Sequence, residues 1–144
     1  MKDKTLTQHG GTLRALIFET GDEVMSSLKK LARSENIRAA RISGIGAFRK
    51  ATIAYFDWEK KEYINIHVNE QVEVLVFMGD LAWNGDEPVP HIHVVLGKRD
   101  GSTIGGHLVE ATVRPTLELM LTQAGALERR HDPASGLALI ALET

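Results

Sequence analysis

The hydrophobic positions of this chain follow a clear helical period only near the N-terminus. An apolar run over residues 13–20 ends at Gly21 and predicts a buried strand. Hydrophobic residues then recur at helical intervals and predict a helix that ends near Asn36. Thr20 precedes Glu23 at the spacing of a capping box, which places the start of the helix here. The hydrophobic positions of the predicted helix are Val24, Met25, Leu28, Leu31 and Ala32.

Most of the remaining chain alternates between apolar and polar residues, as strands do. Residues 51–78 contain three such runs and predict three consecutive strands. Residues 37–47 include Gly44 and Gly46, and glycines there would relieve crowding against a neighbouring element, so we expect a strand and a tight bend. Residues 117–122 also alternate, which favours a strand over a helix.

One segment in the middle of the chain interrupts the alternation. Residues 79–90 contain Asn84-Gly85 together with Pro88 and Pro90, and prolines are disfavoured inside central strands. The sequence therefore predicts a loop of about ten residues, long enough to border a site.

The number and type of these elements predict the fold class. The final strands are expected at residues 127–129 and 137–142. One helix against many strands is typical of an α+β fold, here a mostly antiparallel β-sheet packed by one main helix. The chain has no internal repeat or linker, so residues 1–144 are predicted to form a single domain.

Composition narrows the classes of function. Lys and Arg number 17 against 19 Asp and Glu, and a formal net charge of -2 lacks the basic excess of a dedicated duplex binder. The absence of cysteine excludes disulfides, zinc ribbons and iron–sulfur clusters, which leaves His, Asp and Glu as metal ligands. No apolar run reaches the about 18 residues of a membrane span, so we expect a cytoplasmic protein without membrane contact.

Three histidines are the strongest candidates for chemistry. His91 and His93 are two residues apart in a predicted strand, so their side chains project from the same face. His107 follows a hairpin signal at Asp100-Gly101. A three-residue loop would place His107 opposite His93, with all three imidazoles on one face. A two-residue loop would turn His107 to the other face, unless a β-bulge intervenes. The sequence leaves both alternatives open.

Three imidazoles without cysteine form a known ligand set of catalytic zinc, which keeps one coordination position open. Zinc is the default, although nickel, iron or manganese accept the same ligands. Such a metal suits hydrolysis, hydration or decarboxylation. Glu73, on the strand preceding the site, is the candidate catalytic base. The alternatives are a solvent-facing hairpin that binds no metal and a solvated glutamate.

Two basic pairs, Lys29-Lys30 and Arg129-Arg130, have acidic residues nearby in the sequence. Such mixed-charge stretches are typical of solvated faces, so we assign these residues no site.

Three stretches of the sequence resemble the plants-and-prokaryotes-conserved (PPC) domain family, whose prokaryotic members often carry a DNA-binding label. They are Ser-Gly-Ile-Gly-Ala at residues 43–47, the Pro-His-Ile-His to Gly-Gly-His-Leu block at residues 90–108, and residues 128–137. The resemblance extends over residues 8–142. It implies a mixed fold with an antiparallel sheet and a homotrimeric assembly.

The resemblance also implies a metal at His91, His93 and His107, because the family's fold is similar to that of acetolactate decarboxylase, whose zinc is held by a comparable histidine trio. Plant members carry a Gly-Arg-Phe-Glu stretch that contacts partners. Residues 70–73 correspond to it, and only Glu73 is retained, which leaves Glu73 available to the site. Plant members also carry an Arg-Gly-Arg-Pro hook for the minor groove, which this chain lacks.

Two functional hypotheses follow from different classes. The first is a homotrimeric metal-binding protein that acts on or senses a small carbonyl or carboxylate ligand, either as a zinc-dependent hydrolase or lyase or with a structural metal. The alternative is a DNA-associated regulatory protein. Affinity for duplex DNA comes mainly from Lys and Arg contacts to phosphates, so we expect weak DNA binding by this chain alone.

Overall fold

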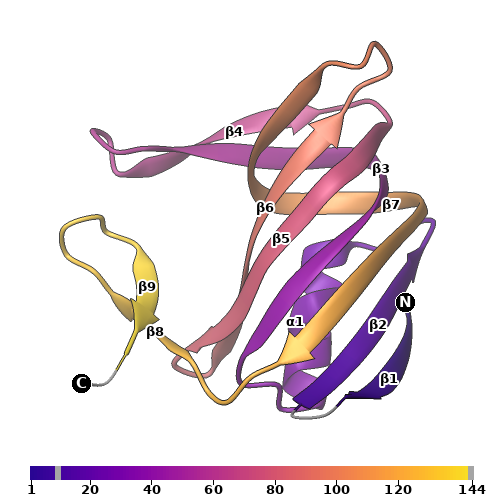
Figure 1. The fold of residues 1–144 in the computed structure, drawn as a ribbon. Helices are drawn as coiled ribbons and strands as arrows, with labels where there is room; N and C mark the ends of the chain where they lie inside the picture. The colour runs from indigo at the N-terminus through magenta and orange to yellow at the C-terminus, as the bar shows by residue number, and fades with distance from the viewer. Residues whose placement is uncertain (9–10, 143–144) are drawn as a thin grey trace.

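The computed structural model describes residues 1–8 and 11–142 and consists mainly of one curved antiparallel sheet with a helix packed on it (Figure 1). This confirms the predicted α+β class. The elements in chain order are β1 (Lys2–Gln8), β2 (Gly11–Glu19), α1 (Val24–Ser34), β3 (Ala40–Asp57), β4 (Glu62–Val68), β5 (Val72–Asn84), β6 (Glu87–Gly97), β7 (Thr103–Gln123), β8 (Glu128–His131) and β9 (Ala138–Ala141). Among the described residues, no helix is long and apolar enough to cross a membrane.

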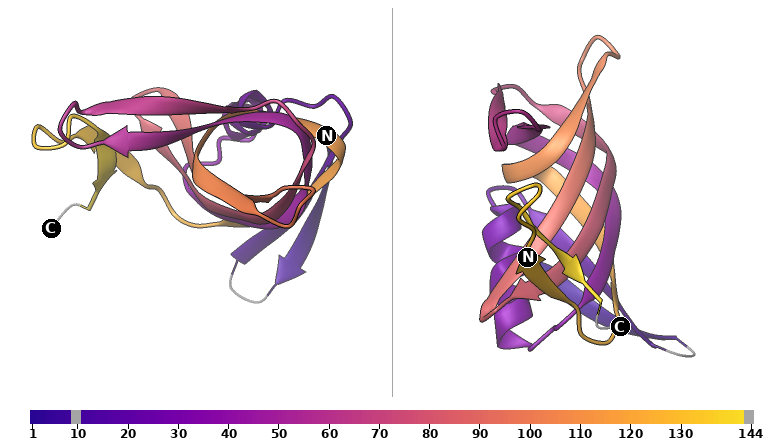
Figure 2. Two further views of the ribbon diagram at one scale, coloured as in Figure 1. Left: turned by 90° about the horizontal axis from the view of Figure 1, so that it is seen from above. Right: turned by 90° about the vertical axis from the view of Figure 1, so that its left-hand side faces the viewer.

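The sheet closes on itself. β3 pairs with β5, β5 with β6, β6 with β7, and β7 with β3, so the ladder returns to its starting strand. The view from above in Figure 2 shows these strands as a ring. β2 continues the sheet from the far half of β7, and β1 pairs with β2. The interior of this barrel is filled by apolar side chains, among them Phe18, Phe48, Phe77, Ile92 and Leu117.

The helix follows the predicted pattern but begins at a different cap. Val24, Met25, Leu28, Leu31 and Ala32 form the buried face of α1, as the sequence predicts, and α1 packs on β6 and β7.

Thr20 does not cap this helix. Its hydroxyl donates to the Pro115 carbonyl, and the carboxylate of Glu23 accepts from the backbone N–H groups of Met25 and Ser26 instead. Glu23 therefore satisfies two of the free donors at the start of the helix.

Residues 79–84 and 87–90 are strand, and only residues 85–86 form a turn, so the predicted loop of about ten residues is absent. β5 and β6 form a tight hairpin here, with Gly85 in the left-handed region at φ 58°. Pro88 and Pro90 both pair with β5, whereas β6 begins to pair with β7 only at His93. Prolines at alternate positions can both turn their missing N–H groups away from β5, toward an edge that needs no donor. The prolines therefore lie where β6 pairs with β5 on one side and has no strand partner on the other.

Two hairpins project from the same side of the barrel in Figure 1. One is formed by β4 and the end of β3. The other is formed by β8 and β9, which joins the barrel through a single parallel pairing between Trp83 and Glu128. The Lys61 ammonium of the first hairpin donates to the Ala134 carbonyl of the second. The space between these hairpins and the barrel wall contains the candidate site.

Close contact between β5 and β6 depends on Gly79. A Cβ atom there would lie 2.0 Å from the His91 carbonyl oxygen and 2.9 Å from the Ile92 Cα. We predict that Gly79→Ala lowers the free energy of unfolding by about 1–3 kcal/mol, because overpacking forces the backbones apart. Urea unfolding measures the change. Gly125→Ala is the matched control, since nothing lies within 4 Å of its added Cβ. Equal stability of the two variants would contradict the prediction.

Candidate metal centre

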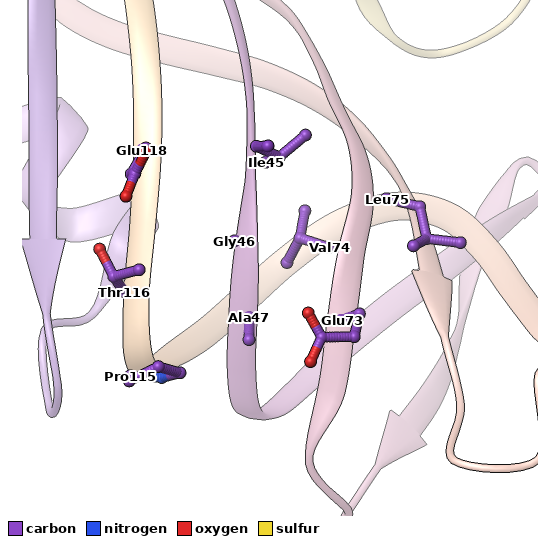
Figure 3. A pocket seen from close by; sticks show the side chains of 9 residues that line it. All are labelled: Ile45, Gly46, Ala47, Glu73, Val74, Leu75, Pro115, Thr116 and Glu118. Carbon is purple, nitrogen blue, oxygen red and sulfur yellow. The ribbon is translucent and has the colours of Figure 1, made fainter.

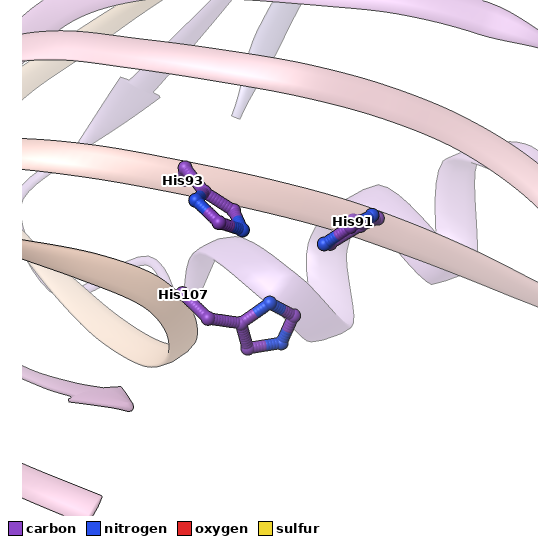
Figure 4. Close-up of side chains that lie close together, drawn as sticks. All are labelled: His91, His93 and His107. Carbon is purple, nitrogen blue, oxygen red and sulfur yellow. The ribbon is translucent and has the colours of Figure 1, made fainter. Parts of the chain in front are cut away.

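The structure brings the three predicted histidines together on the outer face of the barrel (Figure 4). His91 and His93 project from β6, whose intervening Ile92 is fully buried, and His107 projects from β7 directly opposite His93. The ring centroids lie 5.2 Å apart for His91–His93 and His91–His107, and 5.7 Å apart for His93–His107. One nitrogen from each ring lies within 4.8 Å of the other two. The rings can therefore donate to a common point.

The hairpin loop sets this arrangement. The Lys98 N–H donates to the Ser102 carbonyl at 2.8 Å, which leaves three residues in the loop. Gly101 takes φ +83°, and the Asp100 carboxylate accepts from the backbone N–H and hydroxyl of Ser102. This confirms the three-residue alternative, in which His107 faces His93. No β-bulge is needed between them.

Burial lowers the pKa of two of the three imidazoles, His91 and His107. It lowers the pKa of His107 from 6.5 to about 4, with further contributions from His91, His93 and the Arg129 guanidinium. The pKa of His91 is also lowered, first by burial and then by Arg129, while Asp80 acts in the opposite direction. Neutral imidazole is the form that binds metals.

The donor set fits a divalent metal. His107 Nδ1 is buried and has no hydrogen-bond partner in the part of the chain that the structure describes. A buried polar nitrogen without a partner is costly, and a metal ligand role would satisfy it. Within residues 1–8 and 11–142, the cluster consists of these three histidines alone, which leaves a coordination position open.

A cavity of about 430 Å³ lies beside His91 and His107. Its walls come from α1, β4, β6, β7 and the β8–β9 hairpin. The Tyr63 ring of β4 packs at 4.7 Å between centroids against His107, and Val109 and Leu139 supply apolar surface. A small molecule in this cavity would therefore contact the open side of the cluster.

Arg129 lies in this cavity, which corrects the prediction of a solvated Arg129-Arg130 pair. Only 4% of its side chain is exposed, whereas Arg130 is exposed. Its guanidinium lies 2.5 Å from the Asp80 carboxylate and donates to the Ala138 carbonyl at 3.2 Å. Consecutive residues of a strand point to opposite faces, so the two arginines never share a side. Recognising residues 128–131 as a strand would have separated them.

Glu73 does not join the histidines. It lines a different pocket, together with Ala47 of β3 and Glu118 of β7 (Figure 3). Met78 is the β5 residue opposite His93, and Glu73 lies five positions earlier, about 16 Å along a strand that rises about 3.3 Å per residue. The predicted role of Glu73 as base at the cluster has no geometric support in this chain.

The sequence matches the Plants and Prokaryotes Conserved (PCC) domain over residues 6–125, so the chain belongs to this family. The fold is similar to a metal-containing protein from Archaeoglobus fulgidus, with 36% identity, a TM-score of 0.85 and coverage of 92% of this chain and 94% of that one. A plant- and prokaryote-conserved protein from Pyrococcus horikoshii shares 30% identity at a TM-score of 0.85, over 99% and 96% of the chains. A Ralstonia eutropha protein with a provisional DNA-binding name shares 28% identity at a TM-score of 0.85, over 97% of this chain and 96% of that one.

Among curated proteins, the chain is 29% identical over 141 residues to the bifunctional protein GlmU of a Synechococcus strain. The match covers 92% of this chain and only 21% of that protein. The chain therefore spans about a fifth of the length of this relative.

The lowered pKa of His107 predicts how stability depends on pH. Between about pH 4 and 6.5, the unfolded chain binds a proton at this residue and the folded chain does not. The free energy of unfolding of the metal-free protein should therefore fall as pH is lowered through this interval. His107→Gln removes this titration and should flatten the dependence, as urea unfolding at several pH values would measure. His131→Gln, at an exposed position, is the control. The same slope in wild type and His107→Gln would contradict this assignment.

Proposed function

We propose that this chain binds a divalent metal, zinc by default, through His91, His93 and His107, and binds or acts on a small carbonyl or carboxylate ligand there. The observation that carries the proposal is the approach of three imidazole nitrogens to within 4.8 Å at the edge of a cavity. The metal-containing relative from Archaeoglobus fulgidus supports it.

A divalent metal in this position would act as a Lewis acid on a carbonyl or carboxyl oxygen and lower the pKa of a coordinated water. The protein's own residues would orient the ligand and limit the access of water. Tyr63 packs against His107, and apolar side chains line much of the cavity beside it. Hydrolase and lyase chemistry both fit this arrangement, as does ligand sensing without turnover.

The metal site is tested by removing one ligand. Purified protein should contain about one divalent metal per chain, and His93→Ala should reduce this to near zero, because two imidazoles bind far more weakly than three. Elemental analysis measures the content. His93 is exposed, so its truncation leaves the barrel core intact. His131→Ala serves as the control, and unchanged metal in His93→Ala would exclude this site.

We also propose that the chain assembles as a homotrimer. Beyond the PPC resemblance, the support is an apolar surface on the outer face of the barrel, where monomeric proteins rarely leave a large patch exposed. Ile45, Leu75, Met78 and Met120 are 62%, 49%, 50% and 46% exposed. Met78 and Met120 both lie opposite Ser43 across adjacent ladders, so they flank the same position. Neighbouring copies would bury this surface.

Light scattering tests the assembly. The wild type should have a mass near three times 15.9 kDa. Ile45→Asp should shift the mass toward one chain, because a charge would lose its hydration in an apolar interface. Asn69→Asp, an exposed change on the loop between β4 and β5, should leave the mass unchanged. A wild-type mass near 15.9 kDa would contradict the trimer.

The alternative function is a DNA-associated regulatory role, which the provisional name of the Ralstonia eutropha relative supports. Against it stand the net charge of -2 and the pairing of Arg38 with Glu128. A titration of labelled duplex that gave sub-micromolar affinity with a steep salt dependence would favour this alternative over the metal-centred proposal.

A further inference from the structure

The cavity beside the histidines contains a buried cation with an unused donor. The Arg129 guanidinium donates to Asp80 through Nη2 and to the Ala138 carbonyl through Nη1. Its Nε is buried and has no hydrogen-bond partner among the described residues. Buried N–H groups are normally paired, and Arg129 is one of the residues that line the cavity, so the unpaired Nε suits an acceptor supplied by a bound ligand.

The charges around the cavity favour an anion. The described residues that line it include Arg129 and Lys29 and no carboxylate. Arg129 also lies close enough to contribute to the lowered pKa values of His91 and His107. Asp80 offsets the formal charge of Arg129, so the charge of Lys29 remains on the wall, and an acceptor with a single negative charge suits it.

Much of the remaining cavity wall is apolar, although Asn65 also lines it. Val109 of β7 lies on one side, and Leu137, Ala138 and Leu139 approach from the C-terminal hairpin. An inorganic ion would leave this surface in contact with water, whereas a ligand with a hydrocarbon part would cover it. The cavity of about 430 Å³ has room for such a part.

We propose that this cavity binds a small organic monocarboxylate, with the carboxylate accepting from Arg129 Nε and the hydrocarbon part lying against the β8–β9 hairpin. This inference rests on the proposed function in that it uses the same cavity, and it specifies the class of ligand. Arg129 and residues 137–139 lie beyond the region 6–125 that matches the family. The C-terminal hairpin supplies both the guanidinium and part of the apolar wall, so it contributes to which ligand fits. Asp80 is a positioning residue, because its carboxylate holds the guanidinium.

The experiment compares 4-methylpentanoate with 4-methylpentanamide, which have the same shape and differ in charge. Binding is followed by NMR titration of the protein as purified and after treatment with a chelator. The chelated sample isolates Arg129, because a metal would itself prefer the carboxylate. Metal content is measured on both samples, so a failure of the metal site and a failure of this inference are distinguished.

We expect the wild type to bind the carboxylate at least about tenfold more tightly than the amide, with or without metal, as a charge-assisted hydrogen bond implies. Arg129→Gln should lower the affinity for the carboxylate by about tenfold and change the affinity for the amide by no more than about twofold. Arg130→Gln, a change on the exposed side of the same strand, should alter neither.

Several results would overturn the inference. They are equal affinity of the two probes for the chelated wild type, no binding of either probe, or no effect of Arg129→Gln on the carboxylate. Tighter binding of inorganic phosphate than of 4-methylpentanoate would also reject the monocarboxylate class. The comparison of the two probes on wild type needs no variant, so it decides the question even if Arg129→Gln does not fold.

Discussion

The register between β6 and β7 is the constraint on which the candidate site depends. Each strand residue points to the face opposite its neighbours, so a slip of one position would turn His107 inward and Leu108 outward. The three-residue loop after Lys98 prevents this slip, because its hydrogen bonds fix which residues face each other. The loop of residues 99–101 lies at the end of the hairpin, and five residues separate it from His93 on one strand and from His107 on the other. A local turn thus determines a geometry that involves two strands.

Periodicity predicted the fold well where each element has one buried face. The hydrophobic positions of the helix match its buried residues. In residues 51–78 the match is partial, because Ile53 and Val74 are buried, whereas Ile64 and Ile66 of the projecting β4 and Val76 of β5 are exposed. The sequence could not settle residues 79–90, because Asn-Gly and proline signals are shared by loops and by hairpins at a sheet edge. The difference between the two depends on which neighbour the edge has, and that is a property of the tertiary structure.

The candidate site was predictable in part for a similar reason. His91 and His93 share a face by strand geometry, and His107 required only the choice between two loop lengths. Arg129 could not be found this way, since its burial comes from a short strand that joins the barrel by one pairing. The strand order alone could not place Glu73 relative to the histidines, because adjacency of strands says nothing about position along them. Contacts within one ladder follow from the sequence, whereas contacts between separate hairpins do not.

The alternation along β6 places residues that stabilise the fold and residues that form the candidate site on opposite faces of one strand. Ile92 and Val94 are buried and maintain the barrel, while His91 and His93 on the outer face contribute nothing to that core. Substitutions of the outward residues can therefore accumulate without a penalty in the interior. Together with a C-terminal hairpin that joins the barrel through one residue pair, this leaves the scaffold free to acquire new ligand preferences while its fold stays the same. In such a domain, the outer face of the barrel is where substitutions can change ligand binding without changing the fold.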